Sequence, residues 1–203
     1  MRLVCTFIAM SAFVCVGGCS STGSGPYSAA DPARRDTTRA DQLNQEAAEF
    51  MSSSPERAEK LLRDALTADL YHGPAHNNLG VLFLKQHKLY EAAGEFEWAR
   101  KLLPGHPDPR LNLSLTLESA GRHDQAIDHA RTALQIHPGH IASIQQLARL
   151  ELLHPAKPTP GAMRDPGARA DLRSNLEEIA MRGESAAWKD WARLQLVKLD
   201  DAR

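Results

Sequence analysis

Histidine is the residue type in this chain that most directly suggests chemistry, because a neutral imidazole binds metals and exchanges protons near pH 7. Three of the nine histidines, His72, His106 and His140, recur at equal intervals along the chain. Equal spacing places them at equivalent points of stacked helical units, about 10 Å apart, whereas a zinc–nitrogen bond is about 2 Å long. The three histidines therefore cannot share one ion. We expect them to serve as turn and helix-capping residues.

A second possible metal pair is His72 and His76, which are four positions apart, as on one face of a helix. Gly73 and Pro74 lie between them. Because proline breaks the interior of a helix, the two rings are not expected to point at one ion. We therefore predict no metal site.

Acidic pairs are present at Glu95 and Glu97 and at Asp124 and Asp128. A carboxylate acts in general acid–base catalysis only when it is held within hydrogen-bond reach of a substrate, and these pairs lie on charged helical stretches that imply no pocket. The sequence also lacks the patterns G-x-S-x-G, H-E-x-x-H, G-x-x-x-x-G-K-[ST] and G-x-G-x-x-G. We predict no catalytic residue, no cofactor and no enzymatic activity.

All three cysteines lie at or before position 19. Arg2 precedes an uncharged run over residues 3–16, which has the length of the apolar region of a secretory signal and is shorter than a membrane-spanning helix. Val16-Gly17-Gly18-Cys19 resembles a bacterial lipobox, in which small residues precede the cysteine that is acylated. We expect residues 1–18 to be a lipoprotein signal peptide and Cys19 to be lipidated. Plain secretion and a retained anchor are the alternatives.

The lipobox resemblance also implies a location. Ser20 stands where an aspartate would favour retention in the inner membrane of enteric-type bacteria. We therefore expect a lipid anchor in the outer membrane, with the protein facing the periplasm. Residues 19–38 are rich in Ser, Gly and Pro and are expected to be a flexible linker.

The charge balance limits the class of partner. The chain has 24 basic and 25 acidic residues, a net charge of −1, and removal of Arg2 with the signal makes it −2. A nucleic-acid-binding surface requires a basic patch or stripe. A nearly neutral chain therefore argues against nucleic acid as a partner.

The chain after the linker repeats itself with a period of about 34 residues. Alanines mark this period in two series, Ala58, Ala92, Ala126 and Ala65, Ala99, Ala133. Between them, segments such as 75–86 and 89–103 carry apolar residues at helical spacing. A fixed period that alternates short helices with turns predicts stacked helical hairpins.

These repeats resemble the tetratricopeptide repeat (TPR). The best copy, residues 73–106, has His76 in place of the leading tryptophan and carries the motif residues Leu79, Gly80, Phe83, Ala92, Phe96, Ala99 and Pro104. The copy over 107–140 keeps the small and apolar positions but loses the aromatic ones, and an earlier copy keeps Ala58, Leu62 and Ala65. The resemblance implies an all-α fold, a right-handed α-solenoid with three TPR hairpins in residues 39–153. Residues 141–153 would form the first helix of a fourth.

The period ends at residues 154–167, which hold four prolines and two glycines and are expected to form a loop. Residues 168–203 contain two more amphipathic helical patterns, expected near 168–182 and 185–200. Because the terminal units of a solenoid must cover its open end, we expect a C-terminal helical cap. Trp188 and Trp191 could instead form a second partner anchor, since tryptophan is enriched in binding hot spots.

In the TPR family, the first helix of each hairpin lines a concave groove that binds a peptide or helix. The resemblance assigns such a groove to Asn44, Ala48, Met51, Asn77, Val81, Leu84, Leu111, Leu115, Glu118, Gln145 and Arg149. Its apolar middle and polar ends suit an amphipathic helix or an extended segment. It lacks the lysine-and-asparagine clamp with which some family members hold a C-terminal carboxylate. The chain's own C-terminal helices are an alternative occupant.

Taken with the lipobox, the resemblance implies a membrane-anchored, non-catalytic adaptor or scaffold of the bacterial cell envelope. Its partner would be another protein, bound for the assembly of a pilus, a secretin or another envelope complex. The alternative is an accessory subunit that regulates an envelope enzyme, such as a peptidoglycan hydrolase or a protease.

Overall fold

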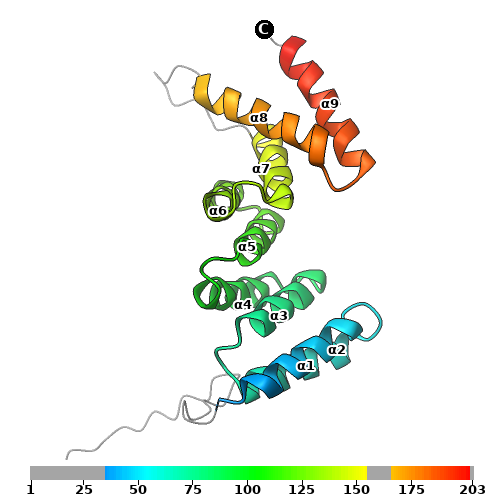
Figure 1. Ribbon diagram of the computed structural model, residues 1–203, viewed down its shortest axis with the longest axis vertical. Helices are drawn as coiled ribbons and strands as arrows, with labels where there is room; N and C mark the ends of the chain where they lie inside the picture. The colour runs from blue at the N-terminus through cyan, green and yellow to red at the C-terminus, as the bar shows by residue number, and fades with distance from the viewer. Residues whose placement is uncertain (1–34, 155–165, 202–203) are drawn as a thin grey trace, which may run out of the picture.

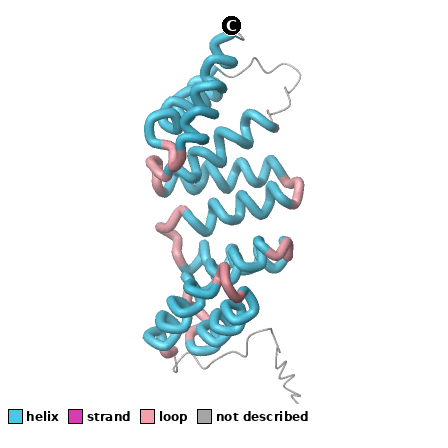
Figure 2. The backbone as a smooth tube through the Cα atoms, turned by 90° about the vertical axis from the view of Figure 1, so that its right-hand side faces the viewer, coloured by secondary structure: helices cyan, strands magenta, loops and turns pink. Residues whose placement is uncertain are grey.

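The computed structural model describes residues 35–154 and 166–201, and these residues form nine α-helices and no strand (Figures 1 and 2). The helices are α1 (Thr37–Phe50), α2 (Pro55–Ala68), α3 (Gly73–Lys85), α4 (Leu89–Leu102), α5 (Asp108–Ser119), α6 (His123–Ile136), α7 (Ile141–Leu153), α8 (Pro166–Arg182) and α9 (Ala186–Asp201). The prediction of an all-α chain is confirmed.

Consecutive helices pair into hairpins that stack along the long axis of the molecule (Figure 1). We call α1–α2, α3–α4 and α5–α6 hairpins 1, 2 and 3. The helix α7 packs against α6 and is followed by the pair α8–α9. The stack is the predicted α-solenoid, with three hairpins and a further helical unit at the C-terminal end.

Each hairpin closes because small side chains let its two helices approach. In hairpin 2, a Cβ atom added to Gly80 would lie 2.6 Å from a ring carbon of Phe96, which is fully buried. In hairpin 3, Ser114 and Ala130 occupy the two equivalent positions, one repeat period later. The hydroxyl of Ser114 fits there and donates a hydrogen bond to the carbonyl oxygen of Ala126 at 2.7 Å. In hairpin 3, the space that a phenylalanine ring occupies in hairpin 2 is therefore available for the side chain of Ser114.

The three evenly spaced histidines lie at the turns between hairpins, as expected. His72 is the N-cap of α3, and its Nδ1 accepts a hydrogen bond from the backbone N–H of Ala75 at 3.1 Å. His140 is the N-cap of α7, and its Nδ1 is 2.8 Å from the hydroxyl of Ser143. His106 lies in the turn between α4 and α5. Within the described ranges, no group of three or more His, Cys, Asp or Glu side chains could hold a metal ion.

The helices α8 and α9 cover the apolar face that α7 would otherwise expose. Ile144 and Ala148 of α7 pack with Leu176 and Ile179 of α8 and with Ala192 of α9, and all five are buried. This packing confirms the predicted C-terminal cap. The cap begins slightly before its predicted start, because α8 already starts at Pro166.

The N-terminal boundary also differs slightly from the prediction. Helix α1 starts at Thr37, two positions inside the segment expected to be linker, because the side chain of Asp36 caps it by accepting a hydrogen bond from the N–H of Arg39 at 2.9 Å. The signal peptide and Cys19 lie outside the described residues, as does most of the proline-rich loop. None of the described helices combines the length and the apolar character needed to cross a membrane.

Candidate partner-binding groove

The first helices of successive hairpins, α1, α3, α5 and α7, contact one another directly. Asparagine side chains bridge these contacts. Asn78 Nδ2 donates to Asn44 Oδ1 at 2.9 Å, which joins α3 to α1. Asn112 Nδ2 donates to Asn77 Oδ1 at 3.0 Å, which joins α5 to α3. All four side chains are half-buried.

The bridging amides are suited to bind a polypeptide backbone. Each asparagine side chain has two N–H donors and an oxygen that accepts two hydrogen bonds, and each bridge uses one donor and one acceptor position. The remaining donor and acceptor positions lie along α1, α3 and α5. There they can form hydrogen bonds with the amide and carbonyl groups of an extended segment.

The apolar residues predicted for the middle of the groove are only partly covered. Val81 and Leu84 are half-buried and pack along one side against the core of hairpins 1 and 2. Leu115 on α5 is also half-buried, and Met51 at the end of α1 packs against the same core. Ala48 is exposed. These five residues therefore present accessible apolar surface.

Two predicted groove residues are not accessible. Leu111 is 9% exposed and Gln145 is 4% exposed. The direct contacts of α5 with α3 and with α7 bring neighbouring first helices close enough to cover side chains near the contact line. The prediction that Leu111 and Gln145 line an open groove is therefore corrected. The amide nitrogen of Gln145 is buried without a hydrogen-bond partner among the described residues.

The predicted polar end of the groove is a closed ion-pair network. Arg149 of α7 contacts Glu118 of α5 through both guanidinium NH groups, one of them at 2.7 Å from Oε1. Gln146 joins the pair, because its Nε2 donates to Glu118 Oε2 at 2.9 Å and its Oε1 accepts from Arg149 at 2.7 Å. Every group in the network has a partner, so this end of the groove offers a neutral, rigid wall rather than a free charge.

Burial and hydrogen bonding act in opposite directions on Glu118. Burial alone would raise the pKa of its carboxyl group. The hydrogen bonds from Arg149 and Gln146 outweigh burial and hold that pKa below its ordinary value of 4.5. The carboxylate is therefore ionised, and the ion pair is intact, at neutral pH.

Three side chains that shape the groove were not among the predicted residues: Asn78, Asn112 and Gln146. Asn44 and Asn78 are one repeat period apart, so the period itself contained a signal for their pairing. Asn112 and Gln146 continue the same series, each one repeat period after the residue before it, so the same signal extended to both.

The two tryptophans predicted as a cap or as a second anchor pack into the cap. Trp188 and Trp191 meet edge to face, with ring centroids 5.1 Å apart. Both are half-buried and lie against the cluster formed by α7, α8 and α9. This placement favours their role in the cap.

Comparison with known proteins agrees with the repeat architecture. The family model described as tetratricopeptide repeat matches residues 77–141. No curated protein sequence matches the chain.

Solved structures share the fold at low sequence identity. A Pseudomonas aeruginosa pilF structure is 20% identical, with a TM-score of 0.67, over 82% of this chain and 71% of that one. The first TPR of Spaghetti (RPAP3), bound to the HSP90 peptide SRMEEVD, is 13% identical, with a TM-score of 0.56, over 59% of this chain and 96% of that one. A Thermobaculum terrenum O-GlcNAc transferase mutant is 23% identical, with a TM-score of 0.59, over 72% of this chain and 27% of that one.

The regular repeat period, the stacked hairpins, the family match and the similar structures agree with one another. Residues 77–141 match the tetratricopeptide repeat family, and the described helices share the fold of solved tetratricopeptide repeat structures.

Proposed function

We propose that this protein is a non-catalytic adaptor that binds a helical or extended segment of a partner protein along α1, α3 and α5. The observation that carries the proposal is the combination of amide bridges and accessible apolar side chains on these helices. A surface of this kind can hold a peptide backbone by hydrogen bonds and its apolar side chains by burial.

The two ends of the groove have different roles in this proposal. At the N-terminal end, Asn44 and Asn78 join the first helices of hairpins 1 and 2 and bond the backbone of the ligand. At the C-terminal end, the pair Glu118–Arg149 ties α5 to α7 and fixes the curvature of the array without adding a free charge. Affinity then comes chiefly from apolar burial at Val81, Leu84 and Leu115.

The proposed location rests on the sequence from Met1 to Cys19. In this proposal Cys19 carries the lipid anchor in the outer membrane, and the predicted linker between Cys19 and α1 separates the helical array from the bilayer. A flexible linker of about 17 residues has a root-mean-square reach of roughly 20 Å. The adaptor would then meet its partner in the periplasm, close to the membrane, during assembly of an envelope complex.

Two aspartate variants of α5 test the groove. Leu115 is half-buried on the proposed binding side, whereas Leu113 is 2% exposed in the packed seam. Full burial of a leucine side chain in an interface contributes about 1.5–3 kcal/mol, so Leu115→Asp should weaken partner binding at least about tenfold. Its thermal melt should stay close to that of the wild type, because the new carboxylate can reach solvent.

Leu113→Asp is the matched control. It places a carboxylate at a side chain that is 2% exposed in the wild type, which strongly destabilises a fold, and should abolish the cooperative melt. Binding is measured by pull-down of the partner on the lipidated full-length protein, with quantitative mass spectrometry. The groove is refuted if Leu115→Asp retains every wild-type partner at the wild-type level, or if it unfolds as Leu113→Asp does.

A further inference from the structure

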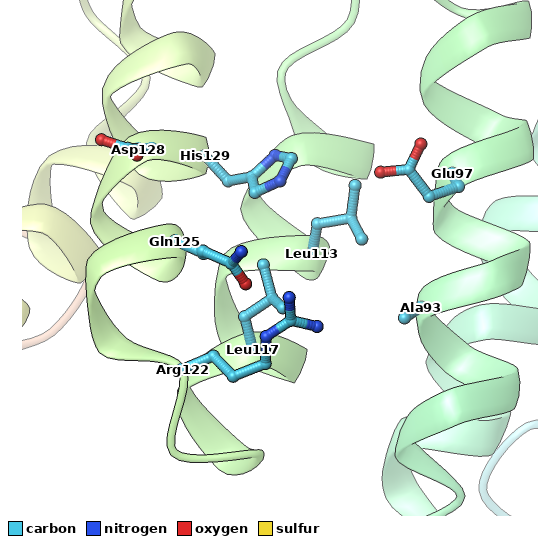
Figure 3. A pocket seen from close by; sticks show the side chains of 8 residues that line it. All are labelled: Ala93, Glu97, Leu113, Leu117, Arg122, Gln125, Asp128 and His129. Carbon is cyan, nitrogen blue, oxygen red and sulfur yellow. The ribbon is translucent and has the colours of Figure 1, made fainter.

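A pocket of about 350 Å³ lies between hairpins 2 and 3 (Figure 3). Its walls come from α4, α5, α6 and the turn before α6, and its lining consists of Ala93, Glu97, Leu113, Leu117, Arg122, Gln125, Asp128 and His129. The volume is at the lower end of the roughly 300–1,000 Å³ that is common for ligand sites. It is large enough for one large side chain.

This pocket is separate from the proposed groove. Leu113 and Leu117 form its apolar floor on α5, whereas Leu111 and Leu115 were assigned to the groove. Residues two apart on a helix point about 200° apart. The pocket therefore opens on the side of α5 that faces away from the groove.

The preceding junction, between hairpins 1 and 2, shows what fills the equivalent space. Phe83 stands one repeat period before Leu117, and its side chain is 4% exposed. The guanidinium carbon of Arg63 lies 5.9 Å from the centroid of its ring, and Lys88 Nζ lies 5.5 Å from it. An aromatic ring with two cations close to it thus fills this space in the earlier repeat.

Two smaller side chains leave the later space unfilled. Leu117 replaces the phenylalanine of the earlier repeat, and Ala93 stands where the earlier repeat has Glu59. The cation at the hairpin turn is kept, since Arg122 occupies the position equivalent to Lys88. The pocket therefore corresponds to the space that Phe83 fills in the preceding repeat. It has no aromatic ring of its own, and Arg122 provides one of the two cations.

The charges around the pocket leave that cation available. Figure 3 shows the guanidinium of Arg122 beside Leu117, and it forms no ion pair with any described residue. Glu97 is already paired, since its Oε2 accepts a hydrogen bond from Arg100 at 2.8 Å. Burial lowers the pKa of His129, so its imidazole is neutral at pH 7. The guanidinium of Arg122 therefore lies beside the apolar side chain of Leu117 without an ionic partner among the described residues.

We propose that this pocket binds an aromatic side chain of a partner protein, with the ring on Leu113 and Leu117 and against Arg122. The ring takes the place that Phe83 takes in the preceding junction. The site is independent of the groove, so the adaptor contacts a partner on two faces of α5.

The test is an NMR titration of isotope-labelled full-length protein with N-acetyl-L-phenylalanine amide, which carries the side chain and the two flanking amides of one residue. The backbone amides of Ala93, Leu117 and His129 should shift and saturate at millimolar concentration. N-acetyl-L-leucine amide should bind at least about threefold more weakly, because it lacks the ring that interacts with the guanidinium.

Leu117→Phe restores the ring of the earlier repeat and should abolish the shifts while raising the melting temperature. Ala93→Met, which narrows the pocket from α4, is the second blocking variant and decides the matter if Leu117→Phe fails to fold. The proposal is overturned by the absence of saturable shifts in the wild type, by equal affinity for the leucine probe, or by unchanged shifts in a folded blocking variant.

Discussion

The close contact between Gly80 and Phe96 gives a prediction whose size follows from the structure. A Cβ atom at position 80 would lie 2.6, 2.7 and 3.0 Å from three carbons of the Phe96 ring. Ordinary van der Waals contacts of a Cβ atom are 3.4–4 Å, so the ring must move by nearly 1 Å. Phe96 is fully buried, and overpacking of this kind costs about 1–3 kcal/mol. In Gly80→Ala, this cost opposes a gain of about 1 kcal/mol from helix propensity.

Hairpin 3 shows how the conflict is relieved, because Ser114 faces Ala130 there and no ring is present. Gly80→Ala should therefore be neutral or destabilising in the wild type, but stabilising by about 1 kcal/mol in a Phe96→Ala background. The difference between the two backgrounds, which is the coupling free energy, should be about 1–3 kcal/mol. The Phe96→Ala change alone should cost about 3–5 kcal/mol.

Urea unfolding of the four proteins in this cycle, monitored by far-UV circular dichroism, measures the coupling. An effect of Gly80→Ala that is the same in both backgrounds, within about 0.5 kcal/mol, would refute the reasoning. The small residue at position 80 would then have a role other than leaving room for the ring of Phe96.

Three further predictions concern the anchor, the cap and the ion pair. Radiolabelled palmitate should enter the wild-type protein but not Cys19→Ser, and equal labelling of both would contradict lipidation at this residue. A chain that ends at His154 should expose Ile144 and Ala148 of α7, and should melt at lower temperature or aggregate; an unchanged melt of a monomer would contradict the cap. Because the folded pKa of Glu118 lies below its ordinary value of 4.5, the stabilisation is present above that value and is lost as the pH falls through the folded pKa. Glu118→Gln should therefore lower the unfolding free energy by about 1–3 kcal/mol at pH 7 and reduce the loss of stability on acidification; equal acid sensitivity of both proteins would contradict this.

The arrangement of the helices could be predicted from the sequence because it depends on residues that recur with a fixed period. The alanine series predicted where the second helices lie. Gly80 and Phe96 predicted the close packing within hairpin 2. The C-terminal cap was predicted from the physical need to cover the face of α7, and the buried Ile179 bears it out.

The groove could be predicted only in part, because it depends on how successive hairpins are rotated. Helical spacing placed Leu111 and Leu115 on one face of α5, but the contact with neighbouring first helices covers Leu111 and leaves Leu115 half-buried. The same rotation brings Glu118 against Arg149 of the next first helix. A pattern within one repeat does not contain this information.

The pocket between hairpins 2 and 3 was missed for a related reason. The loss of aromatic residues in the repeat over 107–140 was visible in the sequence, but nothing there shows whether neighbouring side chains fill the space. The structure shows that they leave about 350 Å³ open, since Ala93 on the facing helix is also small.

Site-specific photocrosslinking in intact cells tests the adaptor function most directly. A photoreactive amino acid is placed at position 115, on the proposed binding side, and in a control protein at Tyr90, which is 91% exposed on α4. The proposal predicts a discrete protein adduct from position 115 that is absent from position 90 and is lost when Leu84→Asp is added to the groove. Absence of an adduct at position 115, or an adduct that Leu84→Asp leaves undiminished, would contradict partner binding in the groove.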